Sequence, residues 1–297
     1  MAKWKYYALL AALCNASIGI FSKSTFTQGM LADQVAFYKC LIAFSFISVL
    51  LLFDKKGLQK IIRLAKGWWK IAFCSFFGIF TLCFFETSAY SYVMVPTVVF
   101  VLLGSSSITT VTLSYFVLKE QMNICHLLGF LLSIVGLFYV INEGGMELIS
   151  IGGILAMIAG IGYGLFLSMT KKLKVDTSGL AFLWWFIGFG MIYLFVPFVL
   201  NKPSLPELSS LPNLLLLSLI PTIGGYFCTA KALSGGDANQ VQLFELTEPV
   251  FASVMGFVFL GELLHGAQIF GAVLILISIY LASQTPQKIF SFYYANR

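Results

Sequence analysis

The sequence predicts an all-α integral membrane protein, with ten transmembrane helices arranged as two inverted five-helix repeats. Hydrophobic residues make up 59% of the 297 residues and charged ones only 10%, too few to cover the surface of a soluble domain of this length. Apolar stretches of roughly 17–24 residues recur along the chain, and such a helix crosses about 30 Å of hydrocarbon. The spacing of one half of the chain is also repeated in the other.

Each apolar stretch is expected to form one membrane-spanning helix. The first follows a basic N-terminus, as a signal peptide would, but its apolar run continues to about Phe21, so we interpret it as a retained helix. The expected spans are 6–22, 34–53, 71–92, 95–118, 125–141, 148–170, 179–200, 212–233, 239–261 and 266–283.

Lysine and arginine are distributed unevenly over the predicted loops. With the N-terminus in the cytoplasm, the outer loops hold only Lys23 and Lys202, while the inner segments hold the others, including the cluster between Lys55 and Lys70. The positive-inside rule therefore predicts a multi-pass protein of the cytoplasmic (inner) membrane with both termini in the cytoplasm. Because basic residues in the inner segments beside the lipid bilayer account for the net charge of +6, no nucleic-acid partner is expected.

An internal repeat supports the division into two halves. GSSSITTVTLSYFVLKE ends at Glu120 and Gly129 follows nine residues later, while LTEPVFASVMGFVFLGE ends at Glu262 and Gly271 follows nine later. The same offset of 142 positions pairs Phe85 with Phe227, Thr87 with Thr229, and Leu118 with Leu260. We expect one repeat in residues 1–143 and a second, inverted by its odd helix number, in 144–297, an architecture typical of transporters.

An apolar helix, a short loop with glutamate and a glycine nine residues on, present twice in a ten-span chain, resembles the EamA-type branch of the drug/metabolite transporter superfamily. The family's proline thirteen residues before the loop glutamate is Pro249 here, but the first half has Ser107 at that place. A basic residue early in the second helix, common in the family, is Lys39. The resemblance implies secondary transport of a small organic solute through a central cavity between the halves.

Glu245, Glu248 and Pro249 interrupt the ninth apolar stretch. A helix starting at Glu248 would be too short to span the membrane, so we expect it to start near Asn239 and to be kinked at Pro249. The glutamates then lie at membrane depth on one face, where a carboxylate facing lipid would cost on the order of 3 kcal/mol. They line a cavity for substrate or protons, or they bond a neighbouring helix.

Glu86 is the most deeply placed carboxylate, and Tyr90 follows one turn later on the same face. Together they are suited to receive an amine. The alternative is a Glu86–Lys39 pair that only joins helices two and three. Lys39 is a candidate for a substrate carboxylate, or it reaches outward to the membrane surface.

The remaining candidates are polar or small residues within spans. Asn15, Tyr163 and Tyr226 are expected to bond a solute or neighbouring helices. Ser105, Ser106 and Ser107 line a pore or bond their own helix backbone. Ala156, Gly160 and Gly164, four residues apart, predict close helix packing. Structural roles at or after helix ends are predicted for Glu120, Glu262, Gly129 and Gly271.

The function predicted from these patterns is secondary transport of an amino acid, an amine or a related metabolite, with export favoured and proton coupling as an option. No phosphate-binding GxxxxGK[ST] motif is present, and no cysteine or histidine has metal-ligand spacing, so no cofactor or metal is expected. The alternatives are uptake of a metabolite or nucleoside-like solute, an intramembrane enzyme, and a structural or receptor-like protein. The oligomeric state stays open.

Overall fold

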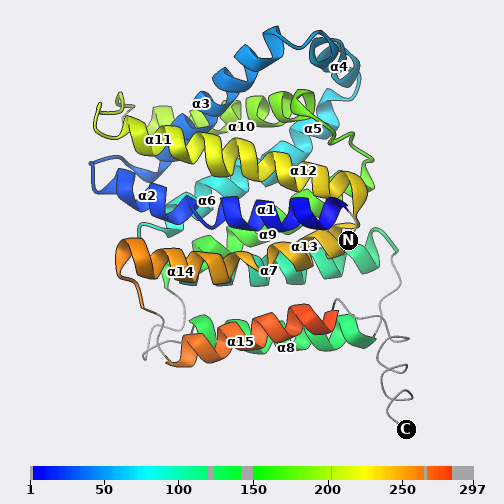
Figure 1. Ribbon diagram of the computed structural model, residues 1–297, viewed down its shortest axis with the longest axis vertical. Helices are drawn as coiled ribbons and strands as arrows, with labels where there is room; N and C mark the ends of the chain where they lie inside the picture. The colour runs from blue at the N-terminus through cyan, green and yellow to red at the C-terminus, as the bar shows by residue number, and fades with distance from the viewer. Residues whose placement is uncertain (1–2, 120–123, 142–149, 202, 264–265, 283–297) are drawn as a thin grey trace.

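The computed structural model describes residues 3–119, 124–141, 150–201, 203–263 and 266–282, and this part of the chain is helical without strands (Figure 1). The first half contains α1 (Lys3–Asn15), α2 (Ile18–Phe26), α3 (Ala32–Leu52), α4 (Lys55–Ala65), α5 (Trp68–Ser75), the π-helical η1 (Phe76–Thr81), α6 (Leu82–Ala89), α7 (Val95–Phe116) and α8 (Ile124–Ile141). The second half contains α9 (Ile151–Lys172), α10 (Leu180–Leu200), α11 (Leu211–Leu217), the π-helical η2 (Ser218–Gly225), α12 (Tyr226–Gly235), α13 (Ala238–Glu245), α14 (Glu248–Leu260) and α15 (Gly266–Ala282).

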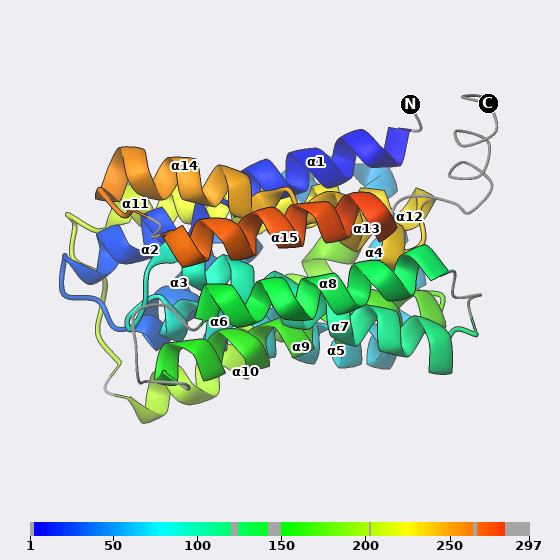
Figure 2. The ribbon, with the colours of Figure 1, turned by 90° about the horizontal axis from the view of Figure 1, so that it is seen from below.

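Eight helical stretches of the described chain are long and apolar enough to cross a bilayer. They are Lys3–Phe26, Ala32–Leu52, Trp68–Ala89, Val95–Phe116, Ile151–Lys172, Leu180–Leu200, Leu211–Gly235 and Ala238–Leu260. Two further apolar helices, α8 and α15, pack against each other along one side of the bundle (Figures 1 and 2). The all-helical membrane class is therefore confirmed, while ten spans in two inverted repeats and the boundary at residue 143 stay predictions.

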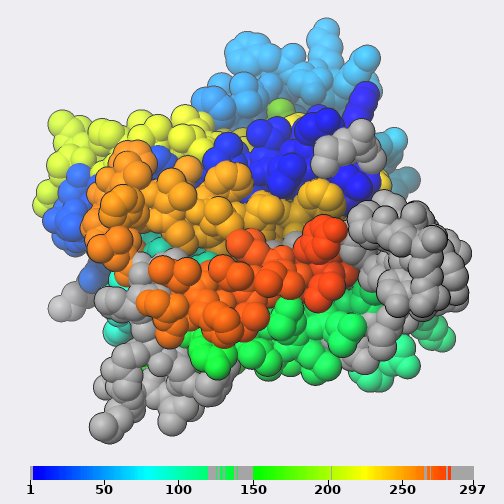
Figure 3. Space-filling model, turned by 60° about the horizontal axis from the view of Figure 1, so that its bottom comes forward, coloured from blue at the N-terminus to red at the C-terminus, as the bar shows by residue number. Residues whose placement is uncertain are grey.

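Many of the helices lie side by side and nearly parallel, whereas α3 and α5 cross them obliquely and α4 lies at the edge of the bundle (Figure 1). On the face shown in Figure 3, α1, α14 and α15 form successive bands of side chains. Large apolar side chains are exposed on the outside of the bundle, among them Phe257, Phe259 and Ile277. The polar side chains described below lie inside the bundle instead.

Two π-helical turns occur at equivalent places in the two halves. Phe76, the first residue of η1, and Ser218, the first of η2, are 142 positions apart, which is the offset of the sequence repeat. A π-helical turn shifts the register of a helix and often occurs at functional sites. The turns are joined, because the hydroxyl of Tyr226, which directly follows η2, donates to the Gly78 carbonyl of η1 at 2.6 Å.

Helices α7 and α9 pack closely at glycines, as the predicted small-residue stripe indicates. A Cβ on Gly160 would lie 2.1 Å from the Leu102 carbonyl oxygen, and one on Gly164 would lie 2.8 Å from the Ser106 carbonyl oxygen. Ala156, one turn earlier, is fully buried. The backbones of the two helices therefore meet without intervening side chains.

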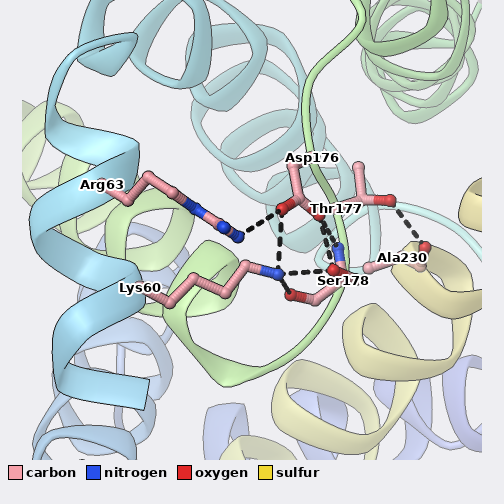
Figure 4. Close-up of polar contacts among 6 residues, drawn as sticks. All are labelled: Lys60, Arg63, Asp176, Thr177, Ser178 and Ala230. Carbon is pink, nitrogen blue, oxygen red and sulfur yellow. Dashed lines mark hydrogen bonds and ion pairs between the residues drawn. The ribbon is translucent and has the colours of Figure 1, made fainter. Parts of the chain in front are cut away.

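The connection between α9 and α10 is fastened to α4 by charged contacts (Figure 4). Asp176 Oδ2 lies 3.0 Å from Lys60 Nζ and 3.7 Å from the Arg63 guanidinium. Its Oδ1 accepts hydrogen bonds from the Ser178 amide at 3.0 Å and the Ser178 hydroxyl at 2.5 Å. The Thr177 hydroxyl donates to the Ala230 carbonyl of α12 at 2.9 Å, so this connection joins both halves of the chain.

Asp176→Asn is expected to lower the melting temperature slightly at neutral pH. Burial alone raises the pKa of Asp176, but the bonds from Ser178 and Lys60 and the Lys60 charge outweigh it and hold the pKa below 3.8. A carboxyl with a depressed pKa stabilises the fold above its ordinary pKa, and this contribution is lost as pH falls through the folded-state pKa. The effect is small because the side chain is 42% exposed.

Melting curves of purified protein at several pH values test this prediction. The difference between wild type and Asp176→Asn should shrink as the pH is lowered below 3.8, the ordinary pKa of the group. Asp237→Asn is the control, since Asp237 is exposed and its side chain makes no capping bond. A difference that stays constant with pH would contradict the assignment.

Candidate functional site

A small cavity lies at the centre of the bundle, between helices of both halves. Its volume is about 30 Å³, room for roughly two water molecules if one needs about 10–15 Å³. Six of the predicted site residues line it: Asn15, Lys39, Glu86, Tyr163, Tyr226 and Glu248. The other lining residues are Ile18, Leu82, Cys83, Leu102, Leu103, Pro221, Thr222 and Thr229.

Lys39 and Glu86 occupy one side of the cavity. The Lys39 ammonium donates to the Thr87 hydroxyl at 3.2 Å, and the Tyr90 hydroxyl donates to Glu86 Oε1 at 3.2 Å. Both charged side chains are almost completely buried. They make no ion pair within 4.0 Å of each other, unlike the pairs found elsewhere in the described chain. The two side chains still interact electrostatically across this distance, and Lys39 also contacts the Cys83 thiol.

Glu245 lies behind the cavity wall and is fully buried. The Tyr163 hydroxyl donates to its Oε2 at 2.5 Å, and the Thr229 hydroxyl donates to its Oε1 at 2.6 Å. Tyr163 from α9 and Thr229 from α12 also line the cavity. Glu245 is thus connected to the site through two hydroxyl groups rather than by direct exposure to it.

Glu248 enters the cavity from the first position of α14. The Asn15 side chain interacts with its carboxyl group. Asn15 ends α1 and also lies against η2, where a Cβ on Gly225 would come within 2.1 Å of its Oδ1. Asn15 therefore links α1 to η2 and α14 at the cavity.

The stretch predicted as the ninth span differs from the single kinked helix that we expected. It is interrupted: α13 ends at Glu245, and α14 begins at Glu248 with Pro249 in its first turn. A proline is favourable there because it has no N–H to donate and its φ is already helical. The two helices together still form the span Ala238–Leu260. In the first half, where Ser107 replaces the proline, α7 is continuous.

Glu262, one of the residues predicted to have a structural role, lies just after α14. Its Oε1 pairs with Lys23 Nζ at 2.5 Å, and its Oε2 accepts the Val95 amide at the start of α7 at 2.8 Å. A carboxylate at a helix N-terminus is stabilised by unpaired amides and by the helix dipole. Glu262 therefore fastens α14 to the ends of α2 and α7, away from the cavity.

The remaining predicted structural residues belong to the α8–α15 pair or lie outside the description. Gly129 in α8 and Gly271 in α15 are buried. The Gly271 carbonyl oxygen would be only 2.8 Å from a Cβ on Gly136 of α8, so these glycines allow close packing of the two helices. Glu120 lies outside the described residues.

Threonines and a cysteine complete the site, and the sequence analysis did not single them out. Thr87 contacts Lys39 and Thr229 contacts Glu245, so each threonine holds a buried charged residue of its own half. Their equivalence in the repeat was a signal that could have identified them. The Cys83 sulfur lies 3.4 Å from the Tyr226 hydroxyl on the cavity wall.

Comparison with known proteins finds relatives whose names describe transporters or an efflux pump. A Bacillus subtilis (strain 168) protein named "Uncharacterized transporter YwfM" is 26% identical over 200 residues, 63% of this chain and 64% of that protein. An "Uncharacterized transporter" of Archaeoglobus fulgidus is 23% identical over 258 residues, 84% of this chain and 87% of that one. A "Probable amino-acid metabolite efflux pump" of Salmonella typhimurium is 25% identical over 193 residues, 60% and 64% of the two chains.

These matches differ in the length that they cover. The chain spans less than two thirds of the Bacillus and Salmonella relatives. A solved crystal structure has a TM-score of 0.71 and 17% identity, covering 95% of this chain and 97% of its own, which shows a shared fold. The model of the family described as "EamA-like transporter family" matches residues 2–142 and again residues 150–284. Because the family model matches most of both halves, the chain belongs to the EamA-like transporter family.

Proposed function

We propose that this protein is a secondary transporter for a small organic solute with an amine group, such as an amino acid or an amine. The observation that carries the proposal is one central cavity lined by Lys39, Glu86 and Glu248. A charged side chain within the membrane costs about 2.5–3.5 kcal/mol or more and is usually functional. Three of them around one cavity support a site for a charged solute.

The charges around the cavity favour a zwitterion in one orientation. A substrate ammonium binds between Glu86 and Glu248, and a substrate carboxylate binds Lys39. Asn15, Tyr163 and Tyr226 contribute hydrogen bonds from the cavity wall, and Tyr90 orients the Glu86 carboxyl. The name of the Salmonella relative, an amino-acid metabolite efflux pump, supports this class of solute and the export direction.

Transport requires the helices to move, because the cavity of about 30 Å³ is too small for an amino acid. We propose ten spans in two inverted five-helix repeats that open the cavity to each side in turn. The π-helical turns at the same repeat offset support this arrangement. The interruptions between α1 and α2 and between α13 and α14 adjoin Asn15 and Glu248, so bending there would reach the site directly.

We further propose that the cytoplasmic membrane holds the protein with both termini in the cytoplasm. The excess of basic residues in the predicted inner segments supports this orientation. A cysteine placed at Lys56 should react with a membrane-impermeant reagent only in inverted vesicles, and labelling in intact cells would contradict the orientation.

Protons drive transport through Glu86, Glu248 or Glu245, whose carboxyl groups are buried at or behind the cavity.

Flux in proteoliposomes tests the function. Purified protein should move labelled amino acids or amines in response to a pH gradient, and protein-free liposomes should not. A panel of amino acids, amines and nucleosides, with the gradient imposed in both directions, separates zwitterion export from nucleoside uptake. Saturable transport of anions alone would contradict the assignment of Glu86 and Glu248 to the substrate amine.

A further inference from the structure

Helix α7 has a row of hydroxyl groups on one face of its C-terminal half, after Leu102 and Leu103, which line the cavity. Ser106, Ser107, Thr110 and Ser114 lie within an arc of about 100° if each residue turns the helix by about 100°. All four are buried. None of them is needed for the proposed substrate contacts.

The orientation of these hydroxyls differs from that of their neighbours on the same helix. Ser105, Thr109 and Thr112 donate to the backbone carbonyls of Val101, Ser105 and Ile108 at 2.7–2.9 Å, the usual solution for hydroxyls in helices. Ser107, Thr110 and Ser114 have no hydrogen-bond partner. The row therefore points away from its own backbone.

The neighbouring helix α13 contributes a further unpaired group. The Ser106 hydroxyl donates to Gln242 Oε1 at 3.0 Å, which shows that the row faces α13 at this level. Gln242 Nε2 has no partner, although the residue is only 2% exposed. Buried polar groups without a protein partner are commonly satisfied by internal water, which typically makes two to four hydrogen bonds.

The row leads from the neighbourhood of Glu245 toward one end of the bundle. Gln242 lies one helical turn before Glu245 on α13, and α13 packs against α7 (Figure 1). Ser114 is two residues before the last residue of α7, at the end of the bundle where α1 begins. A polar row of this length would join the buried carboxyl group to the surface.

We propose that water molecules fill the contact between α7 and α13 and carry protons between Glu245 and the end of the bundle where α1 begins. The proton leaves the Glu245 carboxyl for the first water, and each water passes one proton to the next. This proposal rests on proton coupling in the proposed function. The other titratable groups facing Glu245 are Tyr163 of α9, Cys228 of α12 and Glu248 of α14.

Thr110→Val tests hydration without any transport measurement, because valine keeps the shape of threonine and removes the hydroxyl. If water bonds the hydroxyl, the variant should melt at a lower temperature than wild type. If the contact is dry, removing an unsatisfied hydroxyl should raise the melting temperature, and this result would overturn the proposal. Thr112→Val is the matched control, since the exposed Thr112 hydroxyl bonds its own backbone.

Transport by the same variants in proteoliposomes tests the proton path. Thr110→Val and Gln242→Leu should slow pH-driven flux several-fold and leave exchange at equal pH unchanged, while Thr110→Ser should restore the flux. Wild-type flux in Thr110→Val would overturn the proton path even if its melting temperature falls. If the wild-type protein shows no pH-driven flux, the proton path and proton coupling both fail, whereas the melting result still decides whether the contact holds water.

Discussion

Glu248→Gln is expected to remove the solute accumulation that a pH gradient drives, while exchange of solute at equal pH continues. Glutamine keeps the size and the hydrogen-bonding capacity of glutamate but does not titrate. With one proton coupled to each solute, a gradient of one pH unit supplies about 1.4 kcal/mol and an accumulation ratio of about ten. Without coupling, that ratio falls to about one.

The position of Glu248 is the reason to expect so large an effect. Its carboxyl lies on the cavity, near the Glu86 and Glu245 carboxyls, and interacts with Asn15 of the first span. A change in its protonation therefore alters the contact between α1 and α14, the helices beside the proposed bending points. Glu86 shares the cavity but is held by Tyr90 on its own helix segment, so Glu86→Gln should weaken solute binding more than coupling.

Steady-state accumulation of a labelled solute in proteoliposomes measures the ratio directly. Glu207→Gln is the control, because Glu207 is an exposed carboxylate outside the spans. Accumulation by Glu248→Gln at the wild-type ratio would mean that Glu248 only joins helices. Proton coupling would then depend on Glu86 or Glu245, or transport would be coupled to another ion.

The polar side chains that line the cavity could be predicted because charged and amide groups are costly in hydrocarbon. Lys39, Glu86 and Glu248 stand out in apolar stretches for this reason, and the structure places all three on one cavity. The threonines could not be recognised in the same way. A threonine hydroxyl bonds its own helix backbone as readily as it contacts a buried ion, so only the equivalent places of Thr87 and Thr229 in the repeat set them apart from ordinary helix residues.

The sequence pattern also could not predict where a helix is interrupted within a span or which partner a buried side chain contacts. Proline favours both a kink inside a helix and the first turn of a new one, and Pro249 takes the second place. Glu86 and Lys39 were candidates for an ion pair, but they form hydrogen bonds with Tyr90 and Thr87 and interact with each other only at longer range. Small residues were more informative, since the spacing of Gly160 and Gly164 predicts the close contact of α9 with another helix.

Gly160→Val is expected to destabilise the fold strongly, by about 3 kcal/mol or more, the upper part of the range for overpacking a core. Its Cβ would lie 2.0 Å from the Ser105 hydroxyl and 2.1 Å from the Leu102 carbonyl oxygen. The hydroxyl is able to rotate away, but the carbonyl belongs to the backbone of α7. The helices α7 and α9 must therefore separate, or α9 must shift along its axis.

Either movement changes the cavity as well as the stability. Leu102 and Leu103 of α7 line one wall, and Tyr163 lies three residues after Gly160 on α9. Displacing α9 would pull the Tyr163 hydroxyl from Glu245, which now lies 2.5 Å away. We thus expect Gly160→Val protein that remains folded to transport more slowly than wild type, in addition to melting at a lower temperature.

Thermal melting in detergent and flux in proteoliposomes measure the two effects separately. Gly67→Ala is the control, because a Cβ there would meet nothing closer than the Leu64 carbonyl oxygen at 3.8 Å. Gly160→Ala adds the same Cβ with less bulk and should show both effects to a smaller extent. Wild-type melting and flux in Gly160→Val would mean that α7 and α9 separate without cost, and that their close contact does not set the position of Tyr163.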